Sequence, residues 1–232
     1  MSRRILTGIV GALLLSSTPQ TQEYHRATRG WTTVENYVQQ MFFDMHGSGS
    51  MVFRGTCRDT QQGRVVYSDE LSHPPQGPFK NLGEAMTAVS ALDPHVSWLR
   101  DADGLIRVND DRLIGDVLQV RLKRVRFKRV VDATRAVEVV MSASEVTDYL
   151  QRNHIEQEIL RTASVTPGRD LPELSDELRE VTVAQALDRI IRFFPGLWVY
   201  GECSCGSVRR VTIRASSVGW PSGSLARSIV VQ

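Results

Sequence analysis

Residues 81–89 read NLGEAMTAV, and a stretch of the same pattern, TVAQALDRI, occupies residues 182–190. The two stretches are 101 residues apart, and each is followed at the same distance by a proline, Pro94 or Pro195. Apolar residues occupy equivalent positions in both, at a spacing that predicts one apolar helix face. The pattern predicts an internal repeat of one supersecondary unit.

Each copy predicts a helix followed by a two-stranded hairpin. Asn81 and Thr182 are suitable N-cap residues, and the proline ends each helix because the residue before a proline is displaced from the helical region. The first hairpin is expected at residues 96–108, with Asp103-Gly104 as its turn, and a wider one at residues 197–214.

The remaining apolar pattern predicts an N-terminal helix from Thr33 to Met45 and a long strand from Val117 to Phe127. In that strand the apolar positions change parity after Leu122, which indicates a β-bulge near Lys123-Arg124. Other expected elements are strands at residues 51–57 and 64–67 and helices at 132–141 and 144–153. Residues 137–141 also fit a strand, and residues 142–145 fit a capping box.

These elements predict an α+β fold. We expect two helix-strand-hairpin repeat units packed as small mixed sheets with helices on one face, plus the N-terminal helix. The expected organisation is a signal peptide (1–20), an N-terminal α+β region with the first repeat (21–162), a linker (163–177), the second repeat (178–215) and a C-terminal tail (216–232).

The N-terminus has the parts of a secretory signal. Arg3 and Arg4 precede an apolar run from Ile5 to Leu15, and small and polar residues follow it. The run is shorter than the roughly 20 residues that span a bilayer. An uncleaved anchor or a buried N-terminal helix is the alternative. We therefore expect a periplasmic or extracellular protein with no transmembrane segment after signal cleavage.

The charge balance excludes one class of partner. The 232-residue chain has 28 Lys and Arg against 26 Asp and Glu, and loss of Arg3 and Arg4 would leave 26 of each sign. A net charge near zero gives no general attraction to nucleic acid, so we expect no nucleic-acid partner.

Three cysteines, Cys57, Cys203 and Cys205, would enter an oxidising compartment on export, where a disulfide persists. An odd number leaves at least one unpaired within the chain. We expect a long-range bridge from Cys57 to Cys203 or Cys205, with one remaining thiol. The Cys203-Ser204-Cys205 spacing is too short for a zinc motif, so no metal is expected.

The long strand carries the strongest local charge. Its basic residues are Arg121, Lys123, Arg124, Arg126, Lys128 and Arg129. They form either a patch for an acidic protein, a polysaccharide or a lipid headgroup, or a solvated edge strand on which basic side chains discourage aggregation.

No sequence motif places a catalytic group. The histidines (His25, His46, His73, His95 and His154) have no paired spacing for zinc, and nothing in the sequence places one beside a cysteine. Asp101-Ala102-Asp103-Gly104 lacks the later glutamate of a calcium loop and fits a hairpin turn. We expect no catalytic, cofactor-binding or metal-binding residues and no cofactor.

The repeated unit resembles the secretin and TonB N-terminal short domain and related secretin N-domains. The resemblance lies in a strand, a helix that opens with Thr/Asn-Leu/Val-x-Glu/Gln-Ala-Leu/Met, and a hairpin. The matching residues are 81–108 and 182–214. The resemblance implies a periplasmic module that works through contact with protein partners. Family members continue into a β-barrel or pore domain, and this sequence contains no such region, so pore and receptor functions are not implied.

The expected function is therefore an exported, non-enzymatic module that binds a protein or a cell-envelope component. Two alternatives stay open: a small secreted hydrolase or thiol enzyme that uses a cysteine and a histidine, and a structural subunit that self-associates through exposed strand edges.

Export has a direct test. Fractionation of the native host should find the protein outside the cytoplasm, shortened by about 17 to 22 residues because the apolar run is removed with its flanks. Full-length protein in the cytosol would contradict the assignment.

Overall fold

The computed structural model describes residues 32–60, 63–67, 70–71, 73–158 and 172–217. Helices and strands alternate in these ranges, so the α+β class is confirmed. The expected signal peptide and residues 218–232 of the expected tail (216–232) lie outside the described residues, whereas residues 216–217 are the end of a strand and not tail. In the described part of the chain, no helix is long and apolar enough to span a membrane.

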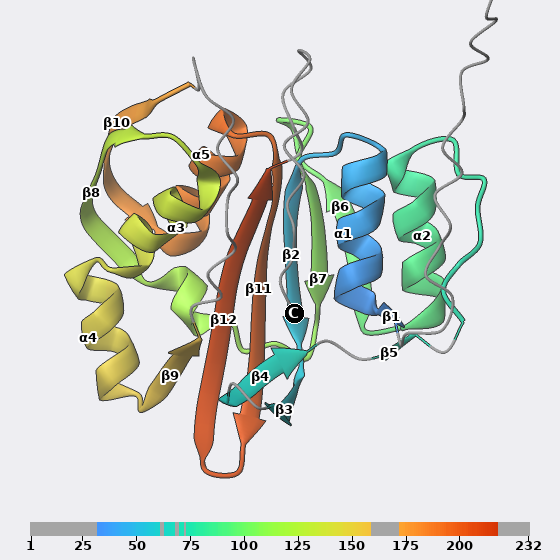
Figure 1. Cartoon of the computed structure of the whole chain (residues 1–232), viewed down its shortest axis with the longest axis horizontal. Coiled ribbons are helices and arrows are strands. Elements are labelled where there is room, and N and C mark those ends of the chain that lie inside the picture. Colours follow the sequence, from blue (N-terminus) through green and yellow to red (C-terminus); the bar gives the residue numbers. More distant parts are fainter. Residues whose placement is uncertain (1–31, 61–62, 68–69, 72, 159–171, 218–232) are drawn as a thin grey trace, which may run out of the picture. The chain divides into compact units, whose positions relative to one another are not determined.

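One six-stranded mixed sheet organises the described residues (Figure 1). Its strand order is β6-β7-β2-β11-β12-β9. The strands are β2 (Gly49–Arg54), β6 (Val96–Arg100), β7 (Ile106–Asp110), β9 (Ile155–Glu158), β11 (Gly196–Cys205) and β12 (Val208–Ser217). The central pair, β2 and β11, is parallel.

Both halves of this sheet have the same topology. In the first half, β2 leads through helix α2 (Leu82–Leu92) to the β6–β7 hairpin, and β7 returns parallel to β2. In the second half, β9 leads to helix α5 (Val183–Phe193), and the β11–β12 hairpin follows this helix. Strand β12 of this hairpin lies parallel to β9. The two predicted helix-hairpin segments are thus present as elements, whereas their common origin as a sequence repeat stays a prediction.

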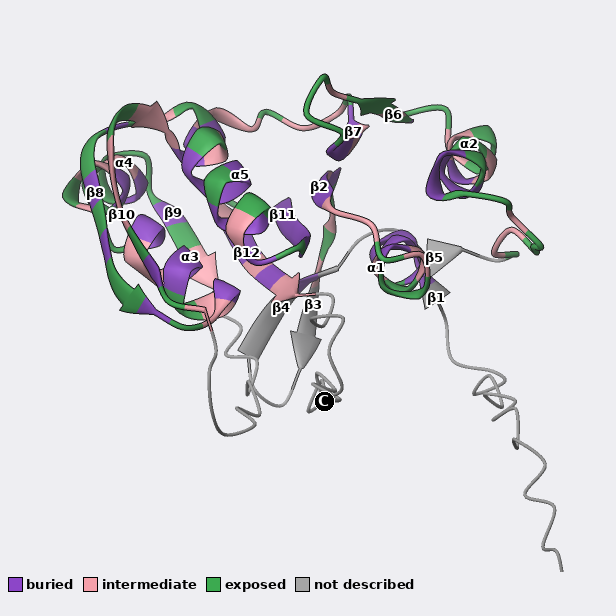
Figure 2. Cartoon of the chain, turned by 90° about the horizontal axis from the view of Figure 1, so that it is seen from above, coloured by how far each residue is buried: buried purple, intermediate pink, exposed green. Residues whose placement is uncertain are grey.

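The helices lie on opposite faces of the sheet, which differs from the expected arrangement of separate small sheets with helices on one face. In Figure 2, α1 (Val34–Asp44) and α2 lie on one side of the sheet, and α5 and α3 (Ala133–Met141) on the other. The strand pairings make β9 antiparallel to β2. Connections between parallel strands through a helix are normally right-handed. Because β2 and β9 run in opposite directions, right-handed connections from each of them place α2 and α5 on opposite faces of the sheet.

Strand β11 separates the two hydrophobic cores. Leu197 and Val199 belong to the core beneath α1 and α2, while Trp198 and Tyr200 belong to the core beneath α3 and α5. Because side chains alternate along a strand, each core takes every second residue of β11. The neighbouring β2 fits closely, since the ring of Phe53 packs directly on Gly201, where any side chain would collide with it.

The N-caps of the two repeat helices are confirmed. The side chains of Asn81 and Thr182 accept hydrogen bonds from the backbone N–H of Glu84 and Gln185. The capping box predicted at residues 142–145 is wrong: Ala143 precedes α4 (Ser144–Arg152) and supplies no side-chain cap. The box forms instead between Thr182 and Gln185. Residues 137–141 are helical within α3, after an Asp132 cap.

A separate antiparallel ribbon covers the α3 and α5 core. It pairs β8 (Arg121–Val130), which follows the 3-10 turn η1 (Asp116–Gln119), with β10 (Leu174–Thr182). Residues 174–177, predicted as linker, are therefore strand, because their backbone completes this ladder. The β-bulge predicted near Lys123-Arg124 is wrong. The apolar positions of β8 do change parity there, but the ladder keeps its register from Arg121 to Phe127, and Glu180 on β10 has a positive φ of 52°. The register shift lies further along, near Arg129 (φ 52°).

Two short antiparallel pairs complete the described strands. The β3 (Thr56–Thr60) and β4 (Gly63–Tyr67) hairpin leaves the end of β2, and β1 (Thr32–Thr33) pairs with β5 (Glu70–Leu71). The predicted extended segment 51–57 is thus divided between β2 and β3.

Overpacking tests the buried face of α2. Ala85 is fully buried against the sheet, whereas Ala91 on the same helix is exposed. Ala85→Phe should reduce the free energy of unfolding by about 1–3 kcal/mol, because a tight core has no room for the ring. Ala91→Phe should change it by less than about 0.5 kcal/mol. Equal denaturation midpoints for both variants would show that the helix face is misassigned.

Candidate functional site

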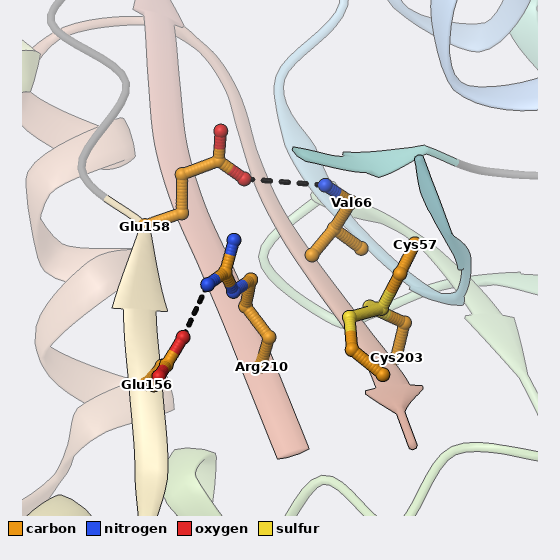
Figure 3. The surroundings of a disulfide bond; sticks show 7 residues. Cys57, Val66, Glu156, Glu158, Cys203 and Arg210 are labelled. Carbon is orange, nitrogen blue, oxygen red and sulfur yellow. Dashed lines mark hydrogen bonds and ion pairs between the residues drawn. A yellow bond between two sulfur atoms is a disulfide. The ribbon is translucent and has the colours of Figure 1, made fainter. Parts of the chain in front are cut away.

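The three cysteines meet at one end of the central strand. Cys203 and Cys205 are two residues apart on β11 and point to the same face, and Cys57 on β3 reaches both. The Cα atom of Cys57 is 6.0 Å from that of Cys203 and 5.7 Å from that of Cys205, and both distances suit a disulfide. Figure 3 shows the bridge from Cys57 to Cys203. Since Cys57 forms only one bridge at a time, two alternative pairings share this sulfur.

The hairpin that carries Cys57 is held from two further points. The Gly55 backbone N–H donates to the Glu202 carbonyl of β11 at 2.7 Å. The Val66 N–H on β4 donates to Glu158 Oε2 on β9 at 3.2 Å (Figure 3). Burial raises the pKa of this Glu158 carboxyl. These contacts place Cys57 over β11 independently of the sulfur chemistry.

An open pocket of about 440 Å³ lies beside the sulfurs. Cys57 and Cys205 line it together with Arg54, Thr56 and Ser204, whereas Cys203 is not among its lining residues. Cys203 is 2% exposed and Cys205 is 8% exposed. None of the histidines in the described part of the chain lines this pocket, so these residues do not assemble the cysteine–histidine pair of a thiol hydrolase.

The cysteine cluster has one other chemical use. The three Sγ atoms lie within 4.8 Å of one another, and three thiolates at this distance suit a soft metal ion such as Zn²⁺ or Cu⁺. A disulfide to Cys57 leaves only one sulfur for a metal, so bridge and metal exclude each other.

All six basic residues predicted on the long strand are exposed along β8. Arg124 and Arg126 both contact Glu177 of β10, at 2.6 Å each, and Arg129 contacts Glu173 at 2.7 Å. Among the described residues, the side chains of Arg121, Lys123 and Lys128 form no ion pair with an acidic side chain. The strand is therefore a partly compensated basic surface, and its role as a binding patch stays a prediction.

The sequence did not indicate a partly buried ionic cluster that the structure contains. Arg209 on β12 donates to Glu202 Oε1 at 2.6 Å and to Asp116 Oδ2 at 2.8 Å. Tyr200 donates its hydroxyl to Glu202 Oε2 at 2.9 Å. Hydrogen bonds from Arg209 lower the pKa of Asp116, and burial raises the pKa of Tyr200. The cluster ties η1 to the hairpin and serves the fold.

A second ionic cluster joins the two halves of the sheet. Arg107 on β7 donates to Asp188 on α5, at 3.2 Å and 2.9 Å, and Asp188 also accepts from the Trp198 indole at 2.9 Å. Nothing in the sequence spacing pairs Arg107 with Asp188, because 81 residues separate them.

The histidine and aspartate residues considered in the sequence take part in surface contacts and in a turn. His95 Nδ1 lies 2.8 Å from Asp111 Oδ1 on the surface. Asp101 accepts from the backbone N–H of Asp103 and Leu105, which confirms the hairpin turn. His25 lies outside the described residues.

Comparisons of the chain with protein-family models, with curated proteins and with solved structures found no match.

The Asp116 carboxylate gives a pH prediction. Its pKa is lowered in the folded state, so its stabilising effect is complete above the unfolded pKa of about 3.9 and is lost as the pH falls through the lower folded value. Asp116→Asn should cost about 0.5–1.5 kcal/mol at pH 7, because Arg209 loses one charged acceptor, keeps Glu202, and is partly screened by solvent. The difference from wild type should shrink below about pH 4.

Urea unfolding at pH 7 and pH 3 measures both effects. Asp103→Asn is the matched control, since the Asp103 side chain is 63% exposed in its ion pair with Arg192 and should contribute little. A cost for Asp116→Asn that is equal at both pH values would contradict the assignment.

Proposed function

We propose that this chain is an exported α+β module that binds an acidic protein or another acidic component of the cell envelope through the β8–β10 ribbon. The observation that carries the proposal is the exposed basic row of β8, a ten-residue strand that pairs with β10 alone in the described part of the chain. The resemblance of the repeat segments to secretin N-domains supports a role in protein contact.

The basic row has more positive charge than its neighbours neutralise. Glu177 alone accepts from Arg124, Arg126 and Arg179, so one carboxylate serves three guanidinium groups. Arg121, Lys123 and Lys128 add positive charge without an ion pair among the described residues, although Glu145 lies near Lys123 and accepts a hydrogen bond from its backbone N–H. A surface of this kind attracts acidic partners and accelerates their association.

The cysteine cluster supports the exported location. A disulfide from Cys57 to β11 persists in the periplasm or outside the cell, whereas the cytosol keeps most thiols reduced. This agrees with the expected signal peptide.

Self-association is a second candidate function. It is favoured by the same observation, since a strand paired on one side exposes backbone groups that another copy could pair with. Light scattering of the purified protein distinguishes the two: a monomer at micromolar concentration favours a separate partner, and a stable oligomer favours self-association.

Cross-linked pull-down from envelope extracts of the native host tests the binding proposal. A triple variant in which Gln replaces Arg121, Lys123 and Lys128 should recover about tenfold less partner, because each of the three exposed charges contributes about 0.5 kcal/mol to the binding free energy. The control replaces the exposed Lys80 and Arg100 with Gln, away from the ribbon. Equal recovery with the β8 variant and the control would contradict the proposed surface.

A further inference from the structure

The arrangement of the three cysteines has a consequence beyond partner binding. The Cα atom of Cys57 lies 6.0 Å from that of Cys203 and 5.7 Å from that of Cys205, two residues on one strand face, and the sulfurs of Cys203 and Cys205 are themselves only 3.5 Å apart. We propose that the three residues form a disulfide-exchange site, in which Cys57 bridges either partner and exchange moves the free thiol between buried Cys203 and pocket-facing Cys205.

The exchange step is balanced within the chain. The Cys205 thiolate attacks Cys57 Sγ, the bond from Cys57 to Cys203 breaks, and a bond from Cys57 to Cys205 forms. Cys203 leaves as a thiolate and takes up the proton that Cys205 released. Disulfides isomerise by such thiolate attack, and no external oxidant or reductant is needed.

The two bridged forms differ in what they expose. With the bridge at Cys203, the free thiol is that of Cys205, which lines the open pocket beside Arg54. With the bridge at Cys205, the free thiol is that of Cys203, which is 2% exposed and does not line the pocket. Exchange therefore moves the free thiol between the pocket wall, at Cys205 (8% exposed), and the interior, at Cys203 (2% exposed), without a change in the oxidation state of the protein.

The structure also indicates the class of molecule that this thiol takes. The pocket is open and polar, and Arg54 lines it together with Cys205. A disulfide entering the pocket would be attacked by the Cys205 thiolate at one of its sulfurs. A mixed disulfide forms, and the other half of the molecule leaves as a thiolate. The bridge from Cys57 to Cys203 is preserved in this step.

The first test traps the bridges. The chain is oxidised with dissolved oxygen, without any disulfide reagent that could cap the free thiol, and is then desalted and unfolded in acid, where exchange stops because thiolates are protonated. Dithiodipyridine then labels the free thiol, and peptide fragmentation locates the label. We expect one labelled thiol per chain, divided between Cys203 and Cys205. A single pairing in every molecule, or three labelled thiols, would overturn the proposal.

The second test follows the reaction of the native protein with excess dithiodipyridine. Molecules with free Cys205 should react in a fast phase whose rate rises with reagent concentration. The others should react in a slower phase limited by exchange, with a rate independent of reagent concentration. A single phase that is linear in reagent would overturn the proposal.

Single variants separate exchange from a fixed bridge and from metal binding. Cys203→Ser and Cys205→Ser should each form the one remaining bridge and retain no reactive thiol, while Cys57→Ser should retain two thiols, of which Cys205 reacts faster. If a variant fails to fold, the acid trap of the wild type still decides. Stoichiometric binding of Zn²⁺ or Cu⁺ by the purified protein, with all three thiols released on acidification, would assign the cluster to a metal and overturn the proposal.

Discussion

The rest of the structure depends on the burial of β11 on both faces. Nine of its ten residues are buried, because one core lies against Leu197 and Val199 and another against Trp198 and Tyr200. A strand covered on both sides needs apolar residues at successive positions, in contrast to the alternation of a strand with one wet face. The run from Gly196 to Gly201 meets this need, and Gly201 leaves space for the ring of Phe53.

This burial makes the two halves of the sheet depend on each other. Strand β2 of the first half pairs with β11 of the second, and Arg107 on β7 reaches Asp188 on α5. The second half in turn supplies Cys203 and Cys205 for the hairpin that extends from β2. The cysteine cluster therefore forms only where the halves meet, since no single half contains all three sulfurs.

Local features of the fold were predictable from the sequence. Helix periodicity, with the caps at Asn81 and Thr182, placed α1, α2 and α5 to within about two residues, because these signals act over a few neighbouring residues. The pairing of β9 with β12 was not predicted, since β9 has only four residues and its register depends on contacts distant in sequence. The same limit applies to the opposite placement of α2 and α5, which follows from strand direction.

The candidate site was predictable only in part. Residue chemistry and export indicated a bridge from Cys57 to the second hairpin, but not that both hairpin cysteines reach the same sulfur. Alternation along β11 explains it, because residues 203 and 205 share a face once that segment is a continuous strand. The Asp116–Arg209–Glu202 cluster left no sequence signal, since its members are brought together by tertiary packing.

Native-state amide hydrogen exchange tests most directly whether β11 makes the two halves one cooperative unit. If it does, the slowest amides of β2 and β7 and those of β11 and β12 exchange with the same free energy of opening, which equals that of global unfolding. If the β2–β7 amides instead open at a lower free energy while β11 and β12 stay closed, the two halves are independent, which contradicts a shared dependence on β11.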